Sequence, residues 1–213
     1  MTYETLFERL GGLAFFDLAT VVQLFDEPRA SIRMQLHRWA GREKLLSLRR
    51  GMYAWPESHR RAPLNPAVLA NALHAPSYLS GLWALSFYGL IPERVMTYTS
   101  VTQRGPRKFE NAAGRFEYRH VKQGAFFGYQ GVQMEGGKAQ VALPEKALLD
   151  FWHLSKGAWT MERMAEMRFQ NVDAVKPRRL LRFARQYGSR RLLGAAEVWR
   201  DTAQDARKGT KTL

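Results

Sequence analysis

Apolar positions in the first 55 residues follow the period of α-helices and then that of β-strands. Three helices are expected, over Tyr3–Leu10, Asp17–Leu24 and Pro28–Ala40, because apolar residues recur there every three or four positions. A tight β-hairpin, Leu45–Trp55, follows, and its turn falls at Arg50–Gly51. Three short helices followed by a hairpin predict a winged helix-turn-helix, which points to nucleic acid.

The third predicted helix has a buried stripe and an opposite, outward face. Ile32, Leu36 and Trp39 recur at positions i, i+4 and i+7, which marks the buried stripe. Asp26 or Glu27 is expected to cap the start of the helix and to favour the positive end of its dipole. The opposite face is then free for solvent or for a ligand.

Several side chains of this helix and of the hairpin turn suit DNA. Small residues near the helix N-terminus admit the helix to the major groove, where arginine and histidine can reach base edges or phosphates. Cations at the tip of the hairpin would contact phosphates or the minor groove. For the helix taken alone, a solvated basic face is the alternative. The predicted DNA-binding residues are Arg29, Ser31, Arg33, Met34, His37, Arg38, Arg49 and Arg50.

Residues 62–155 mix helical and strand-like patterns. β-Branched and aromatic runs predict strands, and the glycine pair at 136–137 predicts a hairpin turn. Ser77 is expected to cap a helix that Pro76 opens, and Ser80 to let another element pack closely. We therefore expect a small antiparallel sheet with helices. The predicted helices are Pro66–Leu73, Pro76–Tyr88 and Pro144–Leu154, and the predicted strands are Val95–Thr102, Arg115–Val121, Phe126–Met134 and Ala139–Leu143.

The last third of the chain is predicted to be helical and strongly basic. Helices are expected over Thr160–Arg168, Pro177–Tyr187 and Ser189–Arg200, and residues 202–213 are expected to be a disordered tail. Arginines on two successive helices predict either a solvated face or a second surface for polyanions, and both interpretations stay open. This candidate polyanion surface consists of Arg178, Arg179, Arg182, Arg185, Arg190 and Arg191.

The predicted fold class is α+β, in four parts. A polar segment with three prolines, Pro56–Pro66, predicts a linker. We expect a winged helix-turn-helix domain over residues 1–58 and an α+β domain with a small antiparallel sheet over residues 59–155. A basic helical extension of that second domain is expected over residues 156–201, followed by the tail over residues 202–213.

The net charge favours polyanionic partners. It is +14 for 213 residues, with a pI of about 10.4. Residues 151–213 carry +8 of this charge, with 14 Lys and Arg against 6 Asp and Glu. Such a balance favours DNA, RNA or an anionic membrane surface.

Composition also argues against several classes of protein. No apolar run reaches the roughly 20 residues of a membrane span, and the first residues lack the pattern of a secretory signal. Cysteine is absent, which removes disulfides, thiolate metal sites and a cysteine nucleophile, and fits a reducing cytosol. We therefore expect a cytoplasmic protein with no membrane partner.

Residues that could act in catalysis or bind a metal are scattered along the sequence. The five histidines form no metal-binding motif and no glycine-rich phosphate loop occurs, so no cofactor, metal or catalytic residue is expected. The enzymatic alternative is a metal-dependent nuclease that uses Glu117, Glu145, Lys146 and Asp150. Because Glu145 and Lys146 are adjacent at a predicted helix start, they point about 100° apart. Glu145 is instead expected to serve its own helix N-terminus, and Asp150 an exposed face or an ion pair.

Short segments between the hairpin and residue 150 form an ordered set: Arg50–Ala54, Pro76–Gly81, Ala84–Leu85, Tyr88–Pro92, Thr99–Thr102 and Pro144–Asp150. In this order and spacing they resemble AbiEi-type antitoxins, which are described as predicted transcriptional regulators of viral defence systems. The resemblance covers roughly residues 1–155. The basic C-terminal helices match more loosely.

The resemblance implies a DNA-binding repressor that acts as the autoregulating antitoxin of a type IV toxin–antitoxin, or abortive infection, system. It implies binding of double-stranded DNA at inverted repeats in the protein's own promoter. It also implies a nucleotidyltransferase-like toxin as functional partner. The antitoxin would counter the effect of this toxin without forming a stable complex with it. An RNA-binding adaptor is the remaining alternative besides the nuclease.

Overall fold

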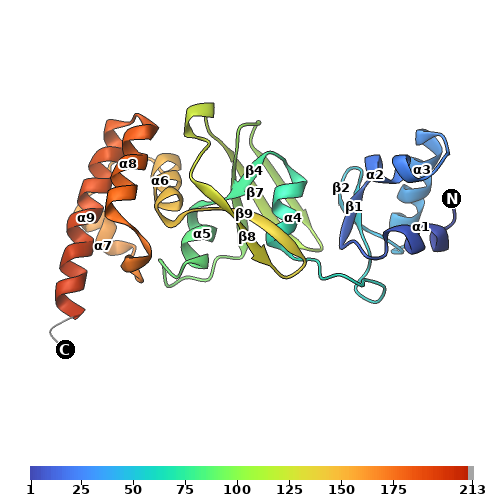
Figure 1. The fold of residues 1–213 in the computed structure, drawn as a ribbon, viewed down its shortest axis with the longest axis horizontal. Coiled ribbons are helices and arrows are strands. Elements are labelled where there is room, and N and C mark those ends of the chain that lie inside the picture. Colours follow the sequence, from blue (N-terminus) through green and yellow to red (C-terminus); the bar gives the residue numbers. More distant parts are fainter. Residues whose placement is uncertain (211–213) are drawn as a thin grey trace.

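The computed structural model describes the backbone of residues 1–210 and the side chains of residues 1–203. These residues form a mixed α+β fold with two separate sheets, one of three strands and one of six. The molecule is elongated, with helices α1–α3 at one end, the larger sheet in the middle and helices α7–α9 at the other end (Figure 1). The predicted α+β class is confirmed.

The first 54 residues build three helices around a small sheet. In that sheet β3 lies between β1 and β2 and is antiparallel to both. The expected helices and the hairpin are all present, each within one or two residues of its predicted ends. The elements are α1 (Tyr3–Leu10), β1 (Phe15–Asp17), α2 (Leu18–Leu24), α3 (Arg29–Gly41), β2 (Leu46–Arg49) and β3 (Met52–Ala54).

One apolar cluster holds this N-terminal unit together. Leu6 of α1, Val21 of α2 and the predicted stripe residues Ile32 and Leu36 of α3 are fully buried. Trp55 lies among them and donates its indole N–H to the Leu10 carbonyl at 3.2 Å. Burial of these side chains fixes which face of α3 remains outward.

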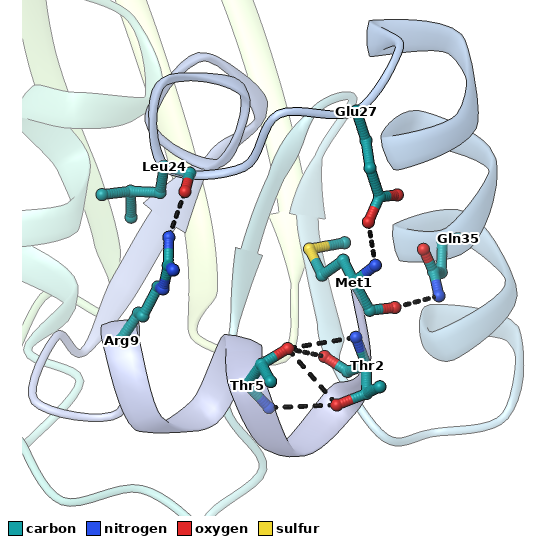
Figure 2. A network of polar contacts seen from close by, with 7 residues as sticks. All are labelled: Met1, Thr2, Thr5, Arg9, Leu24, Glu27 and Gln35. Carbon is teal, nitrogen blue, oxygen red and sulfur yellow. Dashed lines mark hydrogen bonds and ion pairs between the residues drawn. The ribbon is translucent and has the colours of Figure 1, made fainter.

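The start of α3 differs from the expectation. Its N-cap is Pro28, and no side chain caps it. Glu27 pairs instead with the amino group of Met1, and Gln35 donates to the Met1 carbonyl at 2.5 Å (Figure 2). The expected capping role of Asp26 or Glu27 is therefore wrong, because residue 1 lies close enough to take the Glu27 carboxylate.

The middle of the chain forms a six-stranded sheet in the order β6-β7-β5-β4-β9-β8. β4 is parallel to β9 and β5 is parallel to β7, whereas the other neighbours are antiparallel. Its elements are α4 (Pro66–Leu73), β4 (Ser77–Leu79), α5 (Gly81–Phe87), β5 (Thr97–Thr102), β6 (Arg107–Asn111), β7 (Gly114–His120), the 3-10 turn η1 (Gln123–Ala125), β8 (Tyr129–Met134), β9 (Gly137–Ala142) and α6 (Pro144–Leu154).

This sheet is larger than expected and is not purely antiparallel. Ser77–Leu79 is a central strand, β4, where the apolar pattern predicted a helix. Strand β6 was not predicted, because it lies at the sheet edge and its mostly exposed residues give no apolar signal. The error at β4 has another origin, since its pairing with β5 and β9 joins segments far apart in sequence and is not encoded in local periodicity.

The C-terminal helices pack on the sheet through α6. They are α7 (Met161–Glu166), the 3-10 turn η2 (Val172–Ala174), α8 (Pro177–Tyr187) and α9 (Arg190–Thr210). Leu180 of α8 and Trp199 of α9 join the same apolar core as the sheet. Helix α9 continues to Thr210, so residues 202–210 are helical, where a disordered tail was expected. Residues 211–213 of that expected tail lie outside the described part of the chain.

The small sheet also contacts the larger one. Leu48, Met52 and Ala54 of the hairpin belong to the core of the larger unit. The Asn111 amide donates to the Leu48 carbonyl at 2.8 Å and ties the hairpin to the β6–β7 turn. Within residues 1–210, no helix is long and apolar enough to cross a membrane.

Candidate nucleic-acid interface

A groove of about 1350 Å³ runs between α3 and the β2–β3 hairpin. Six of the eight predicted DNA-binding residues line it, from both elements. Ser31 and Arg38 are exposed on α3 but do not line the groove. The lining residues are Asp17, Leu18, Ala19, Arg29, Ala30, Arg33, Met34, His37, Ser47, Arg49, Arg50, Gly51 and Tyr53.

Helix α3 presents Arg29, Arg33 and His37 as one row, because residues four apart lie on the same side of a helix. The row is outward because Ile32 and Leu36 are buried. All three row residues are exposed, as is Met34. Neither Arg29 nor Arg33 makes a hydrogen bond or ion pair with another described residue. Both guanidinium groups are thus free to meet an anion.

The hairpin turn places Arg49 and Arg50 differently. Arg50 is exposed, whereas Arg49 is half-buried and donates to the Arg50 carbonyl at 3.3 Å. Gly51 has a positive φ of 74°, which a residue with a side chain rarely adopts, and its carbonyl accepts the Leu18 amide at 2.9 Å. The turn is therefore fixed against α2, and Arg50 is its free cation.

The groove carries an excess of positive charge. Asp17 is its one acidic lining residue, and its carboxylate accepts a hydrogen bond from the Thr20 amide at 2.8 Å as the N-cap of α2. Burial raises the pKa of the Tyr53 hydroxyl in the groove lining, and the nearby charge of Arg33 opposes that rise. Four arginines and one histidine thus line the groove against a single acidic residue.

Ser47 and Tyr53 line the groove although sequence reasoning did not single them out. They are cross-strand partners in the hairpin. Because side chains alternate between the two faces of a sheet, the sequence could have indicated that Ser47 and Tyr53 share one face of the hairpin. It could not have indicated that this face turns towards α3.

The candidate polyanion surface of the C-terminal helices is only partly exposed. Arg178, Arg182 and Arg185 of α8 and Arg190 of α9 are exposed. A hollow of about 720 Å³ beside the start of α8 includes three of the predicted arginines, together with Lys176. Arg179, one of these three, and Arg191 instead pair with groups of other helices.

Arg179 forms an ion pair with Glu145 at 3.0 Å, and the Glu145 carboxylate also accepts the Lys176 amide at 2.7 Å. Glu145 is fully buried. It therefore serves the N-terminus of α8, whereas its own helix was expected to be its partner. Position in the sequence could not show this, because the two helices meet only in the folded chain.

Arg191 is also withdrawn from the surface set. Its guanidinium donates to the carbonyls of Trp152, His153, Ser155 and Gly157, at 2.9 Å, 3.0 Å, 3.1 Å and 3.0 Å. These carbonyls lie at the end of α6 and just beyond it, where a helix leaves acceptors without intrahelical partners. Arg191 thus closes that helix end and joins α9 to it.

Lys146 and Asp150 form a buried ion pair on α6. Tyr78 and Ser80 donate to Asp150 at 3.0 Å and 2.7 Å, and Lys146 donates to Tyr78 at 2.8 Å. Burial lowers the pKa of Lys146, and Asp150 opposes that effect. Asp150 therefore has the expected ion pair, but not the expected exposed face.

The expected cap is wrong, because Ser77 lies within β4 and caps no helix. Ser80, which was expected to let another element pack closely, is buried and donates a hydrogen bond to Asp150 of α6. Glu117 pairs with Lys108 at 3.7 Å and Arg119 at 3.0 Å. The carboxylates weighed for a nuclease are thus not gathered at one site.

Within the described residues, no group of three or more His, Cys, Asp or Glu side chains could hold a metal ion. Neither a protein-family model nor a curated protein matches the chain.

Proposed function

We propose that this chain is a DNA-binding transcriptional repressor whose N-terminal unit acts as a winged helix-turn-helix. The observation that carries the proposal is the groove between α3 and the hairpin, which gathers Arg29, Arg33, His37, Arg49 and Arg50. Cations from a helix and a hairpin turn can contact duplex DNA from two directions at once.

In this proposal α3 enters the major groove and the hairpin lies along the phosphate backbone. Arg33 and His37 would reach base edges, because both belong to the outward row of α3 and line the groove. Arg50 would contact phosphate, which contributes affinity without reading sequence. Repression follows if the bound site overlaps the promoter of the protein's own gene.

The proposed biological role is that of the autoregulating antitoxin of a type IV toxin–antitoxin system in the bacterial cytoplasm. This role rests on the resemblance of residues 1–155 to AbiEi-type antitoxins. Its functional partner would be a nucleotidyltransferase-like toxin, opposed without a stable complex. Co-expression with such a toxin from the neighbouring gene should restore growth, and continued growth arrest would contradict the antitoxin role.

A salt-dependent gel shift tests the DNA-binding proposal. The probe is duplex DNA from immediately upstream of the protein's own gene, and the control is the same DNA with its sequence shuffled. We expect selective retardation of the upstream probe that weakens as salt rises. Equal retardation of both probes would show only the attraction of a chain of net charge +14 for any polyanion.

A further inference from the structure

Three aromatic side chains form a partly exposed ladder on the unit of the larger sheet. The rings of Trp83 and Phe87 stack with centroids 5.4 Å apart and an interplanar angle of 10°. Tyr98 continues the ladder at 5.6 Å from Trp83. Phe87 is 44% exposed, and Trp83 and Tyr98 are half-buried.

The fold holds this ladder in place. Trp83 and Phe87 lie four residues apart on α5, whose opposite side buries Ala84 and Leu85 in the core. The Trp83 amide donates to the Thr99 hydroxyl on β5 at 3.3 Å. The rings are therefore ordered before any ligand arrives, which lowers the entropy lost on binding.

A free cation lies beside the ladder. Arg94 is exposed and makes no hydrogen bond or ion pair with another described residue. Burial raises the pKa of the Tyr98 hydroxyl, and the nearby charge of Arg94 opposes that rise. Glu93, the adjacent acid, is occupied by Arg168 at 3.0 Å. Apolar rings and an unpaired arginine thus share one surface.

We propose that this surface, formed by Trp83, Phe87, Tyr98 and Arg94, binds single-stranded RNA by stacking of its bases. Trp83 contacts both Phe87 and Tyr98, and Tyr98 also stacks on the buried ring of Phe116 at 5.4 Å. Phe87 is therefore the end of the ladder on which a base would stack, with Arg94 for a neighbouring phosphate. Bases of duplex DNA are paired and stacked on one another, so they cannot lie on these rings. Single-stranded segments with unstacked bases are the usual targets of RNA recognition.

A second copy of this chain fits the surface less well. A two-fold contact places the same patch on both partners. It would bring two unpaired Arg94 side chains towards one interface, between chains that each carry a net charge of +14. An anionic partner avoids this repulsion, so charge complementarity favours the nucleic acid.

The test is fluorescence anisotropy of a labelled single-stranded RNA of about ten nucleotides, within the usual size of such sites. The full chain is titrated beside Phe87→Ala, Phe87→Leu and Arg94→Ala. We expect binding about tenfold weaker for each variant. Phe87→Leu keeps an apolar side chain but lacks the ring face, so it separates stacking from simple apolar contact.

Two substitutions serve as controls. Lys156→Ala removes an exposed lysine that follows α6 and belongs to neither predicted surface, and Met161→Ala removes an apolar side chain that is 53% exposed. Both should bind the RNA nearly as the unchanged chain does. Circular dichroism of every variant confirms that the fold is retained.

Several outcomes would overturn the proposal. These are no RNA binding, binding that Phe87→Leu and Arg94→Ala leave unchanged, or tighter binding of single-stranded DNA of the same sequence. Sedimentation that shows a dimer lost in Phe87→Ala, without RNA binding, would assign the surface to a second copy. Arg33→Ala in the groove should leave RNA binding unchanged, which keeps this test separate from that of the repressor.

Discussion

The hydroxyl of Tyr187 donates to the buried carboxylate of Asp150 at 2.5 Å and so joins α8 to α6. Asp150 already pairs with Lys146, and Tyr78 and Ser80 supply further donors. A buried charge needs such partners, because a low local dielectric makes an unpaired polar group costly. The attachment of the basic helices to the sheet therefore depends on this polar cluster.

Removal of that hydroxyl should destabilise the chain. Tyr187→Phe keeps the ring but leaves Asp150 with one donor fewer, and we expect a loss of about 1–3 kcal/mol in the free energy of unfolding. Urea unfolding followed by circular dichroism measures it. Arg185→Ala, on the exposed side of the same helix, should change stability by no more than about 0.5 kcal/mol. Equal effects of the two substitutions would contradict the role of the cluster.

Stability should fall at alkaline pH. Burial raises the pKa of Tyr78, Tyr118 and Tyr187 above the ordinary value of 10.0. From about pH 10 the unfolded chain loses these protons while the native chain keeps them, so the free energy of unfolding falls as pH rises. Burial lowers the pKa of Lys146, which acts in the opposite direction below its ordinary value of 10.5.

The alkaline decline is therefore measured above pH 10.5, where the Lys146 effect has ended. The midpoint of urea unfolding is followed as pH rises. Tyr187→Phe removes one of the titrating groups, so its midpoint should fall less steeply than that of the unchanged chain. A midpoint that stays constant or rises over this pH range would contradict the prediction.

Substitutions on α3 should separate groove residues from other exposed ones. Arg33→Ala removes a free cation from the groove, and we expect it to cost about 1–3 kcal/mol in binding of the upstream duplex. Arg38→Ala removes an exposed cation of the same helix that lies outside the groove lining, so its effect should be smaller. Gel-shift titrations on upstream and shuffled DNA measure both. A larger effect of Arg38→Ala would indicate that DNA contacts a face of α3 outside the groove.

The hairpin turn should contribute affinity more than selectivity. Arg50→Ala is expected to weaken binding of upstream and shuffled DNA alike and to reduce the dependence of log affinity on log salt by about one unit. Binding measured over a series of salt concentrations gives this slope. Lys156→Ala, which removes an exposed lysine outside both predicted surfaces, is the control. An unchanged slope in Arg50→Ala would show that Arg50 does not contact phosphate.

Two adjacent arginines should differ sharply in their effect on stability. Arg191→Ala removes donors from four carbonyls around the end of α6, and we expect a loss of about 1–3 kcal/mol. Arg190→Ala removes an exposed side chain and should be near neutral. Thermal unfolding of both variants tests this difference. Similar melting temperatures would mean that the Arg191 hydrogen bonds contribute little net stability.

Much of the local structure was predictable from the sequence because it depends on neighbours along the chain. The helices Tyr3–Leu10, Pro66–Leu73, Pro144–Leu154 and Pro177–Tyr187 have the bounds that apolar spacing, proline and glycine indicate. The hairpin turn at Arg50–Gly51 is also where it was expected, because its glycine permits the positive φ that the turn needs. Six of the thirteen groove-lining residues follow from this hairpin and the predicted third helix.

Only the tertiary structure decided which residues meet across the chain. Strand β4 is a strand because it pairs with β5 and β9, although its own sequence resembles the start of a helix. Glu145 and Arg191 take partners on other helices, so neither does what its position suggested. Periodicity tells which side of an element is buried, but the partner on that side is set by packing between segments far apart in sequence.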